Sequence, residues 1–117
     1  MLTMNMNIKS FFLVVLISTG SSALSQTNSV VYKEIKGIKL KMDDYLSETY
    51  TSSKTYPAMV FFFGGGWING KPSQFAPHAK YLSAKGIICF LADYRVKERN
   101  NTTRFEALMD AKSAPIP

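Results

Sequence analysis

The stretch "PAMVFFFGGGWING", at residues 57–70, joins two opposite kinds of sequence. Its first half contains "AMVFFF" at residues 58–63, which has no polar face. A continuous apolar run of this length is typical of a parallel strand that helices cover on both sides. Its second half, "GGGWING", is rich in glycine, which lets a backbone turn sharply or be approached closely. The stretch therefore predicts a buried strand that ends in a tight, accessible loop.

Two short strand patterns precede this stretch. Residues 30–35 and 38–42 flank Gly37, and the second of them alternates apolar and basic side chains. Alternation with a period of two is typical of a strand with one solvated face, so the pair predicts a β-hairpin. Residues 43–57 are polar and rich in Ser and Thr, which predicts a loop.

Helix and strand patterns alternate after the glycines. Residues 73–86 predict a helix, and residues 87–92 a second fully apolar strand. Residues 105–114 predict another helix. The inner face of the first helix is expected to carry Phe75, Ala79, Leu82 and, as a further candidate, Tyr81. That of the second is expected to carry Leu108 and either Ala107 or Ala111.

This order of elements predicts an α/β fold, because buried parallel strands alternate with helices. In such sheets, ligands bind at loops that follow the carboxyl ends of the strands. The glycine-rich loop occupies such a position.

The N-terminal residues 1–25 have the pattern of a secretory signal peptide. Lys9 precedes an apolar run at residues 11–18, and small residues lead up to a cleavage position near Ser25. A membrane anchor or a buried helix is the alternative, but the run is shorter than the ~20 residues that cross a bilayer. We therefore expect an exported protein, periplasmic or extracellular, without a stable membrane anchor.

Composition argues against metal and nucleic-acid chemistry. The net charge is +6, but the basic residues are spread out, which favours a solvated face over a nucleic-acid surface. One histidine and one cysteine are too few for a metal centre. The cysteine, Cys89, lies within an apolar strand pattern and is expected to be buried. We expect no metal, no cofactor and no nucleic-acid partner.

A glycine-rich loop after a buried strand can have one of three roles. It can cradle a phosphate, direct backbone N–H groups at an oxyanion, or form a tight turn without chemistry. The phosphate-binding pattern G-x-G-x-x-G is absent. The pattern G-K-[ST] is absent as well, because Pro72 follows Lys71 where Ser or Thr is required. The glycines alone do not decide between the other two roles.

Three segments in order carry a resemblance to a known family. "MVFFFGGGWING" resembles the oxyanion-hole segment of α/β-hydrolase esterases and lipases. "YLSAKGIICFLADYRV" resembles their next helix and strand, including the ending Asp93, Tyr94 and Arg95. "FEALMDAKSA" resembles the following helix, where Asp110 and Ala114 match a D-x-x-x-A pattern. The resemblance covers roughly residues 31–114, and the group most similar to this chain is the small secreted esterases of the feruloyl- and acetyl-esterase type.

The resemblance implies the N-terminal part of an α/β-hydrolase fold, with an incomplete sheet, and the cleavage of small-molecule or polysaccharide acyl esters. The amides of Gly65 and Gly66 would be the oxyanion-hole donors, and Gly64 would supply the backbone conformation. The Trp67 side chain would either line the acyl pocket or pack against other residues of the protein. Phe63 stands where histidine is commonest in the family, and its ring would pack beneath the loop.

The catalytic triad of this family is not found in the sequence. Its Ser, Asp or Glu, and His follow the oxyanion segment in that order, and no G-x-S-x-G occurs here. His78 precedes the place of the serine and is expected to be a partly exposed helix residue. Structural roles are expected for Asp93 and Asp110. We therefore expect residues 26–117 to form the N-terminal portion of a secreted ester hydrolase, inactive as it stands. The alternative is a non-catalytic exported binding module or a decayed fragment.

Overall fold

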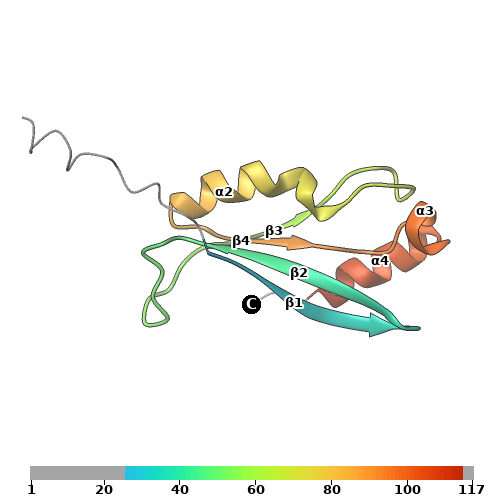
Figure 1. The fold of residues 1–117 in the computed structure, drawn as a ribbon, viewed down its shortest axis with the longest axis horizontal. Coiled ribbons are helices and arrows are strands. Elements are labelled where there is room, and N and C mark those ends of the chain that lie inside the picture. Colours follow the sequence, from blue (N-terminus) through green and yellow to red (C-terminus); the bar gives the residue numbers. More distant parts are fainter. Residues whose placement is uncertain (1–25, 115–117) are drawn as a thin grey trace, which may run out of the picture.

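The computed structural model describes residues 26–114. The predicted signal peptide at residues 1–25, its cleavage position and residues 115–117 lie outside this range. The described residues form a four-stranded sheet with helices on both faces (Figure 1). Among them, no helix is both long and apolar enough to cross a membrane.

The predicted hairpin opens the described chain. β1 (Gln26–Ile35) and β2 (Ile38–Leu46) pair antiparallel, and Lys36 and Gly37 form the turn between them. Both turn residues have a positive φ, at 49° and 77°, which the tightest two-residue hairpin turns require. The register shifts between Val31 and Lys33, so β1 carries an irregularity along its length.

β4 (Ile88–Ala92) lies inside the sheet. It pairs parallel with β3 (Ala58–Phe62) and antiparallel with β2, in the order β1-β2-β4-β3. The pairing with β2 joins Met42 to Ala92 and Tyr45 to Cys89. Residues 43–46 are strand, because they pair with residues 26–29 of β1 and, as far as Tyr45, with β4, so the prediction of a loop beginning at residue 43 is wrong there. The predicted α/β class is confirmed, with a partial mixed sheet.

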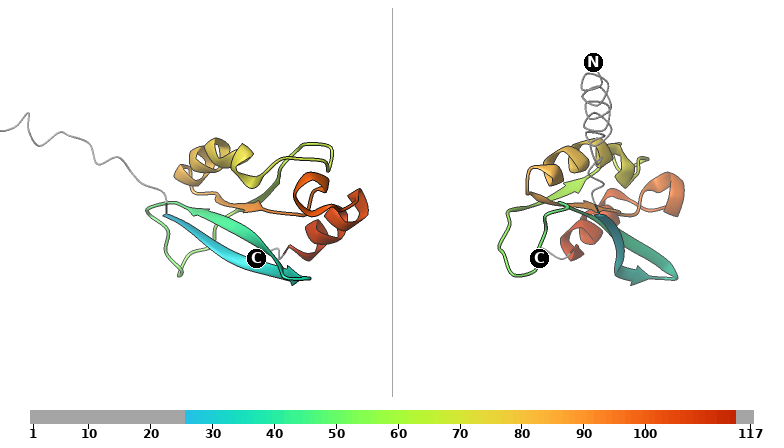
Figure 2. Two further views of the ribbon diagram at one scale, coloured as in Figure 1. Left: turned by 45° about the vertical axis from the view of Figure 1, so that its right-hand side comes forward. Right: turned by 60° about the vertical axis from the view of Figure 1, so that its left-hand side comes forward.

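Two helices of nine and ten residues and two four-residue helices connect and follow the strands. η1 (Pro72–Phe75), a 3-10 turn, leads into α2 (Ala76–Ala84), and both precede β4. α3 (Lys97–Asn100) and α4 (Arg104–Ser113) come after β4. The views of Figure 2 show α2 and α4 on opposite faces of the sheet.

Neighbouring residues of β4 pack against opposite faces. Cys89 and Leu91 are buried in one cluster with Ala79 of α2, which confirms the predicted burial of the cysteine. Ala92 belongs to the cluster on the other face, together with Met42 and Ala114. The core is therefore two thin layers, one on each side of the central strands.

The predicted inner face of α2 is confirmed for three of its four candidates. Ala79 is fully buried, and Phe75 and Leu82 pack against the same cluster. Tyr81 is 64% exposed and does not belong to this face.

The predicted inner face of α4 is wrong at Leu108, which is 51% exposed. Ala107 is buried and Ala111 half-buried. The buried Asp110, three residues after Ala107, lies on the inner side of this helix. A buried ionic contact therefore sets the rotation of α4, and the largest apolar side chains face outward.

β3 is less covered than its sequence predicts. Met59 and Phe62 are 41% and 42% exposed. Within residues 26–114, β3 pairs with β4 along one edge and its other edge is open. The prediction of a strand buried on both faces is therefore wrong for the described part of the chain, because no described strand pairs with this edge.

Candidate functional site

The glycine-rich loop follows β3 directly and turns sharply. Gly65 and Gly66 have φ values of 146° and 64°, and Trp67 also lies in the left-handed region at 62°. The amides of Ile68 and Asn69 both donate hydrogen bonds to the carbonyl of Gly65, at 3.2 and 3.4 Å. This pair of bonds closes the turn around the Gly65 carbonyl.

Two of the glycines are required by space as well as by conformation. A Cβ atom on Gly65 would lie 2.1 Å from the backbone oxygen of Asn69. One on Gly70 would lie 2.4 Å from the carbonyl oxygen of Gly64. A Cβ on Gly66 would meet nothing within 4 Å, so only its positive φ disfavours a side chain. The close approach predicted from the sequence is thus, in part, an approach of the loop to itself.

Gly64 does not have the role predicted for its backbone. Its φ lies outside the left-handed region, and a Cβ there would make only an ordinary contact of 3.7 Å with Oε1 of Gln74. The amide of Gly64 donates to the same oxygen at 2.7 Å. The special conformation begins one residue later, and Gly64 ties the loop to η1.

The amides of Gly65 and Gly66 differ from that of Gly64. Neither donates a hydrogen bond to any acceptor within residues 26–114, and both residues are exposed. Unpaired, adjacent N–H groups on a constrained turn can bind an oxygen that carries negative charge. A loop with these amides already paired would not have this capacity.

A hollow of about 260 Å³ lies beside these amides. The glycines and Trp67 line one side of it, and α4 contributes Ala107, Leu108 and Ala111. The outward rotation of α4 thus places Leu108 in the wall of this hollow. Trp67 is half-exposed and lines the hollow, where a small apolar group has room to bind.

The segment after β4 holds the glycine loop in place. The rings of Tyr94 and Phe63 stack with centroids 4.1 Å apart, and the Tyr94 hydroxyl donates to the Phe63 carbonyl. The amides of Lys97 and Glu98 donate to the carbonyls of Trp67 and Ile68, at 3.1 and 3.0 Å. Phe63 is only 3% exposed, so its ring packs beneath the loop as expected.

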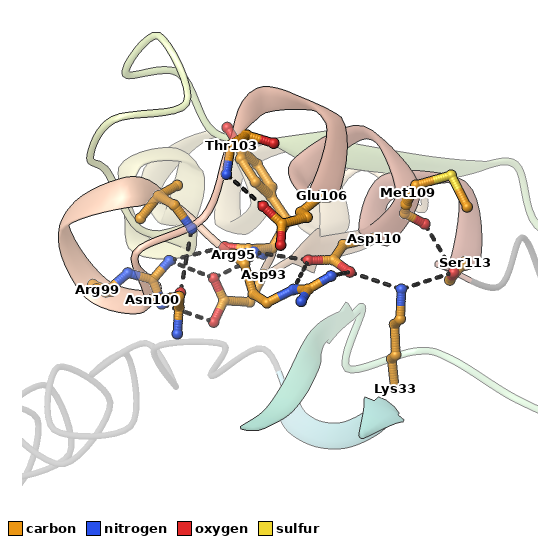
Figure 3. A network of polar contacts seen from close by, with 12 residues as sticks. Lys33, Asp93, Arg95, Arg99, Asn100, Thr103, Glu106, Met109, Asp110 and Ser113 are labelled. Carbon is orange, nitrogen blue, oxygen red and sulfur yellow. Dashed lines mark hydrogen bonds and ion pairs between the residues drawn. The ribbon is translucent and has the colours of Figure 1, made fainter. Parts of the chain in front are cut away.

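A buried ion-pair network supports the same segment (Figure 3). Arg95 donates to Asp110 from Nε and Nη2, at 2.8 and 3.0 Å, and also from its backbone amide. Lys33 of β1 adds a 2.7 Å ion pair to the same carboxylate. Burial alone would raise the pKa of Asp110, but the hydrogen bonds from Arg95 and Lys33 outweigh burial and hold it below its ordinary value. The predicted structural role of Asp110 is confirmed.

Asp93 also has the predicted structural role. Its carboxylate pairs with Arg99 at 2.8 Å, and Arg99 in turn donates to the carbonyl of Tyr94. His78 is exposed in α2, with its ring edge against Phe75. Among residues 26–114, no group of three metal-ligating side chains comes together. None of these residues forms a nucleophile–base pair.

The sequence places Tyr94 in a motif with Asp93 and Arg95 but indicates no role for it. Gln74, Asn69 and Arg99 were missed entirely. The contacts of Tyr94, Gln74 and Arg99 depend on how η1 and the segment after β4 fold back on the loop, so the sequence order carries no local signal for them. Asn69 lies within the loop itself.

Comparisons with known proteins agree with this architecture. No protein-family model and no curated protein matches the chain. Esterase 2 of Thermogutta terrifontis, solved after phosphorylation by paraoxon, is 39% identical with a TM-score of 0.72. That match covers 75% of this chain and 34% of the esterase. The butyrate-bound form is 38% identical with a TM-score of 0.69, over 79% of this chain and 32% of the esterase.

The apo form of the same esterase is also 38% identical, with a TM-score of 0.69, and the match covers 79% of this chain and 33% of the esterase. The chain thus spans about a third of the length of the esterase it matches. The described residues have the N-terminal part of the α/β-hydrolase fold. Within that superfamily, the chain is related to the esterases.

Proposed function

We propose that this chain supplies the oxyanion loop of a secreted carboxylic-ester hydrolase. The amides of Gly65 and Gly66 would bind the carbonyl oxygen of the ester, and Gly64 and Trp67 would contact the substrate. The observation that carries this proposal is the pair of unpaired, adjacent amides beside an apolar hollow.

The chemistry of ester cleavage explains why such a pair is useful. Attack on the carbonyl carbon moves negative charge onto the carbonyl oxygen, and donors about 3 Å away stabilise that charge. The stabilisation is largest when the donors need no reorganisation during the reaction. Here Gly65 is fixed by two hydrogen bonds to its own carbonyl and by the close approach of Asn69.

The nucleophile and base are proposed to come from outside the printed sequence. The triad of related esterases follows the oxyanion segment, and the only histidine, His78, is exposed in α2 away from any serine partner. The 117-residue chain by itself is therefore expected to be inactive. Export rests on the signal-peptide pattern of residues 1–25 alone.

Short acyl esters are the proposed substrates, on small alcohols or on polysaccharides. Structures of the Thermogutta esterase contain butyrate and propionate. The hollow of about 260 Å³ beside Gly65 and Gly66 has a mainly apolar lining, which suits a short acyl chain.

Titration of the ¹⁵N-labelled chain with butyrate tests the oxyanion loop without needing the triad. We expect the amide resonances of Gly65 and Gly66 to shift together, while those of Gly37 and Gly86, far along the sequence, stay in place. Sodium chloride at equal ionic strength is the control for general anion effects. A folded chain whose Gly65 and Gly66 amides ignore butyrate would contradict the proposal.

The coding sequence downstream of Pro117 tests the hydrolase itself. A continuing frame with G-x-S-x-G is expected, and its product should hydrolyse p-nitrophenyl butyrate in a serine-dependent manner. If that product bound butyrate without turnover, the binding-module alternative would be favoured.

A further inference from the structure

Phe63 directly precedes the glycine loop and is buried beneath it. A phenyl ring cannot donate a hydrogen bond, so another residue must fix the start of the loop. We propose that Tyr94 is this positioning residue: its hydroxyl fixes the Phe63–Gly64 peptide and thereby the direction of the Gly65 and Gly66 amides. This inference rests on the proposed function of the loop.

The Phe63–Gly64 peptide unit is held at both of its polar ends. Its carbonyl accepts the hydrogen bond from the Tyr94 hydroxyl, and its N–H donates to Gln74 at 2.7 Å. Carbonyl and N–H share one rigid plane, so two bonds to opposite ends prevent the unit from rotating. The direction in which the chain enters Gly64 is therefore fixed.

This restraint matters because the next two residues are glycines. Gly65 and Gly66 have access to more backbone conformations than any other residues, and their amides keep one direction only if the ends of the segment are fixed. Beyond them, the carbonyl of Trp67 accepts the Lys97 amide at 3.1 Å. Tyr94 and Lys97 belong to one short segment after β4, so the same segment fixes both ends of the glycine pair.

Tyr94 is itself well held. It is 6% exposed and stacks on Phe63 with an interplanar angle of 8°. The guanidinium of Arg99 lies 5.8 Å from the centroid of the Phe63 ring and donates to the Tyr94 carbonyl at 3.1 Å. Burial, with a further contribution from the Asp93 carboxylate, raises the pKa of Tyr94, so the hydroxyl keeps its proton and remains a donor at neutral pH.

Tyr94→Phe and Tyr32→Phe form a matched pair for the test. Both variants lose one hydroxyl that donates to a backbone carbonyl, that of Phe63 for Tyr94 and that of Asp93 for Tyr32. Tyr94→Phe also keeps an aromatic ring for the stack on Phe63. Only the Tyr94 hydroxyl touches the glycine loop, so a general loss of packing would affect both variants alike.

The readouts are the ¹⁵N backbone order parameters of Gly65 and Gly66, which report the motion of amides that make no hydrogen bond, and butyrate affinity, in the full 117-residue chain. For Tyr94→Phe we expect both order parameters to fall and butyrate affinity to fall by about tenfold, the equivalent of one lost hydrogen bond of ~1.4 kcal/mol. For Tyr32→Phe both readouts should change less. If Tyr94→Phe left the order parameters and the affinity at wild-type values, Tyr94 would have no positioning role.

Gln74→Ala provides a second route to the same answer, since Gln74 is exposed and holds the other end of the same peptide unit. It should lower the order parameters of Gly65 and Gly66 even if Tyr94→Phe does not fold, and unchanged order parameters would contradict the inference. If the wild-type chain ignores butyrate, the proposed function fails. The order parameters measured without ligand then still decide whether Tyr94 orders these amides.

Discussion

The two edges of the sheet differ in how they meet their surroundings. β1, at one edge, carries Lys33, which reaches the buried Asp110, and its register shifts between Val31 and Lys33. β3, at the other edge, has only apolar residues and exposes Met59 and Phe62. Charged residues and irregularities protect an edge from pairing with another strand, and β3 has neither. Of the two edges, that of β3 is therefore the one less protected against pairing with another strand.

Removing the carboxylate of Asp110, which pairs with Lys33 of β1 and with Arg95, should have the largest effect on stability. Asp110→Ala leaves the buried Arg95 without its carboxylate, which we expect to cost about 3–5 kcal/mol in unfolding free energy. Lys33→Met is the control, because its partly exposed ammonium should contribute about 1 kcal/mol or less. Urea unfolding followed by circular dichroism measures both. Equal losses in the two variants would show that Arg95 does not depend on Asp110.

Substitutions in the glycine loop after β3 should have a smaller effect on stability, and that effect should be confined to the loop. In Gly65→Ala the new Cβ would lie 2.1 Å from the Asn69 oxygen, so the turn must rearrange. In Gly66→Ala only the left-handed φ is costly, at about 1–2 kcal/mol. We expect Gly65→Ala to abolish the butyrate-induced shift at Gly66 and to cost more stability than Gly66→Ala. If Gly66→Ala proved the more damaging, the described turn would be wrong.

Acid should weaken the ion-pair network around Asp110. The folded-state pKa of Asp110 lies below its ordinary value of 3.8, so its stabilising contribution is complete above that pH. The contribution is lost as the pH falls through the lowered value, because the unfolded chain then binds the proton more readily. Urea midpoints from neutral pH to below 3.8 should therefore decline in the wild type, and less steeply in Asp110→Asn. Parallel declines would assign the acid sensitivity to other carboxylates.

A charge on the open edge should have the smallest effect on stability. Met59→Lys changes an exposed side chain and should alter the unfolding free energy by at most about 0.5 kcal/mol. It should nevertheless raise the concentration at which the chain stays monomeric, because lysine opposes edge-to-edge pairing. Val31→Lys on β1 is the control and should change self-association less. Sedimentation velocity over a concentration series distinguishes them, and equal effects would remove the distinction between the two edges.

Much of the fold could be predicted from the sequence, because its signals are local. The apolar runs at residues 58–63 and 87–92 and the glycines after the first run fixed the order of the elements. The end of β2 could not be predicted in this way, because residues 43–46 become strand through pairing with residues 26–29 of β1 and with β4. Leu108 was assigned to the core on hydrophobicity, whereas the rotation of α4 depends on Asp110, whose partners lie in two other parts of the chain.

The candidate site could also be predicted only in part from the sequence. The glycines mark a loop that backbone can approach, and the structure leaves the Gly65 and Gly66 amides unpaired within residues 26–114. The groups that hold this loop, above all Tyr94 and Gln74, come from η1 and from the segment after β4, both later in the chain. Their roles follow from tertiary contacts, which no pattern within the loop can reveal.

The buried Cys89 provides a natural reporter for such experiments. It is the single cysteine of the sequence, it is 0% exposed, and its strand is hydrogen-bonded on both sides, by β2 and by β3. Burial raises the pKa of its thiol, which further slows attack on a labelling reagent. Pulse labelling with a maleimide would thus record how often the middle of the sheet separates, in every variant and without an added tag.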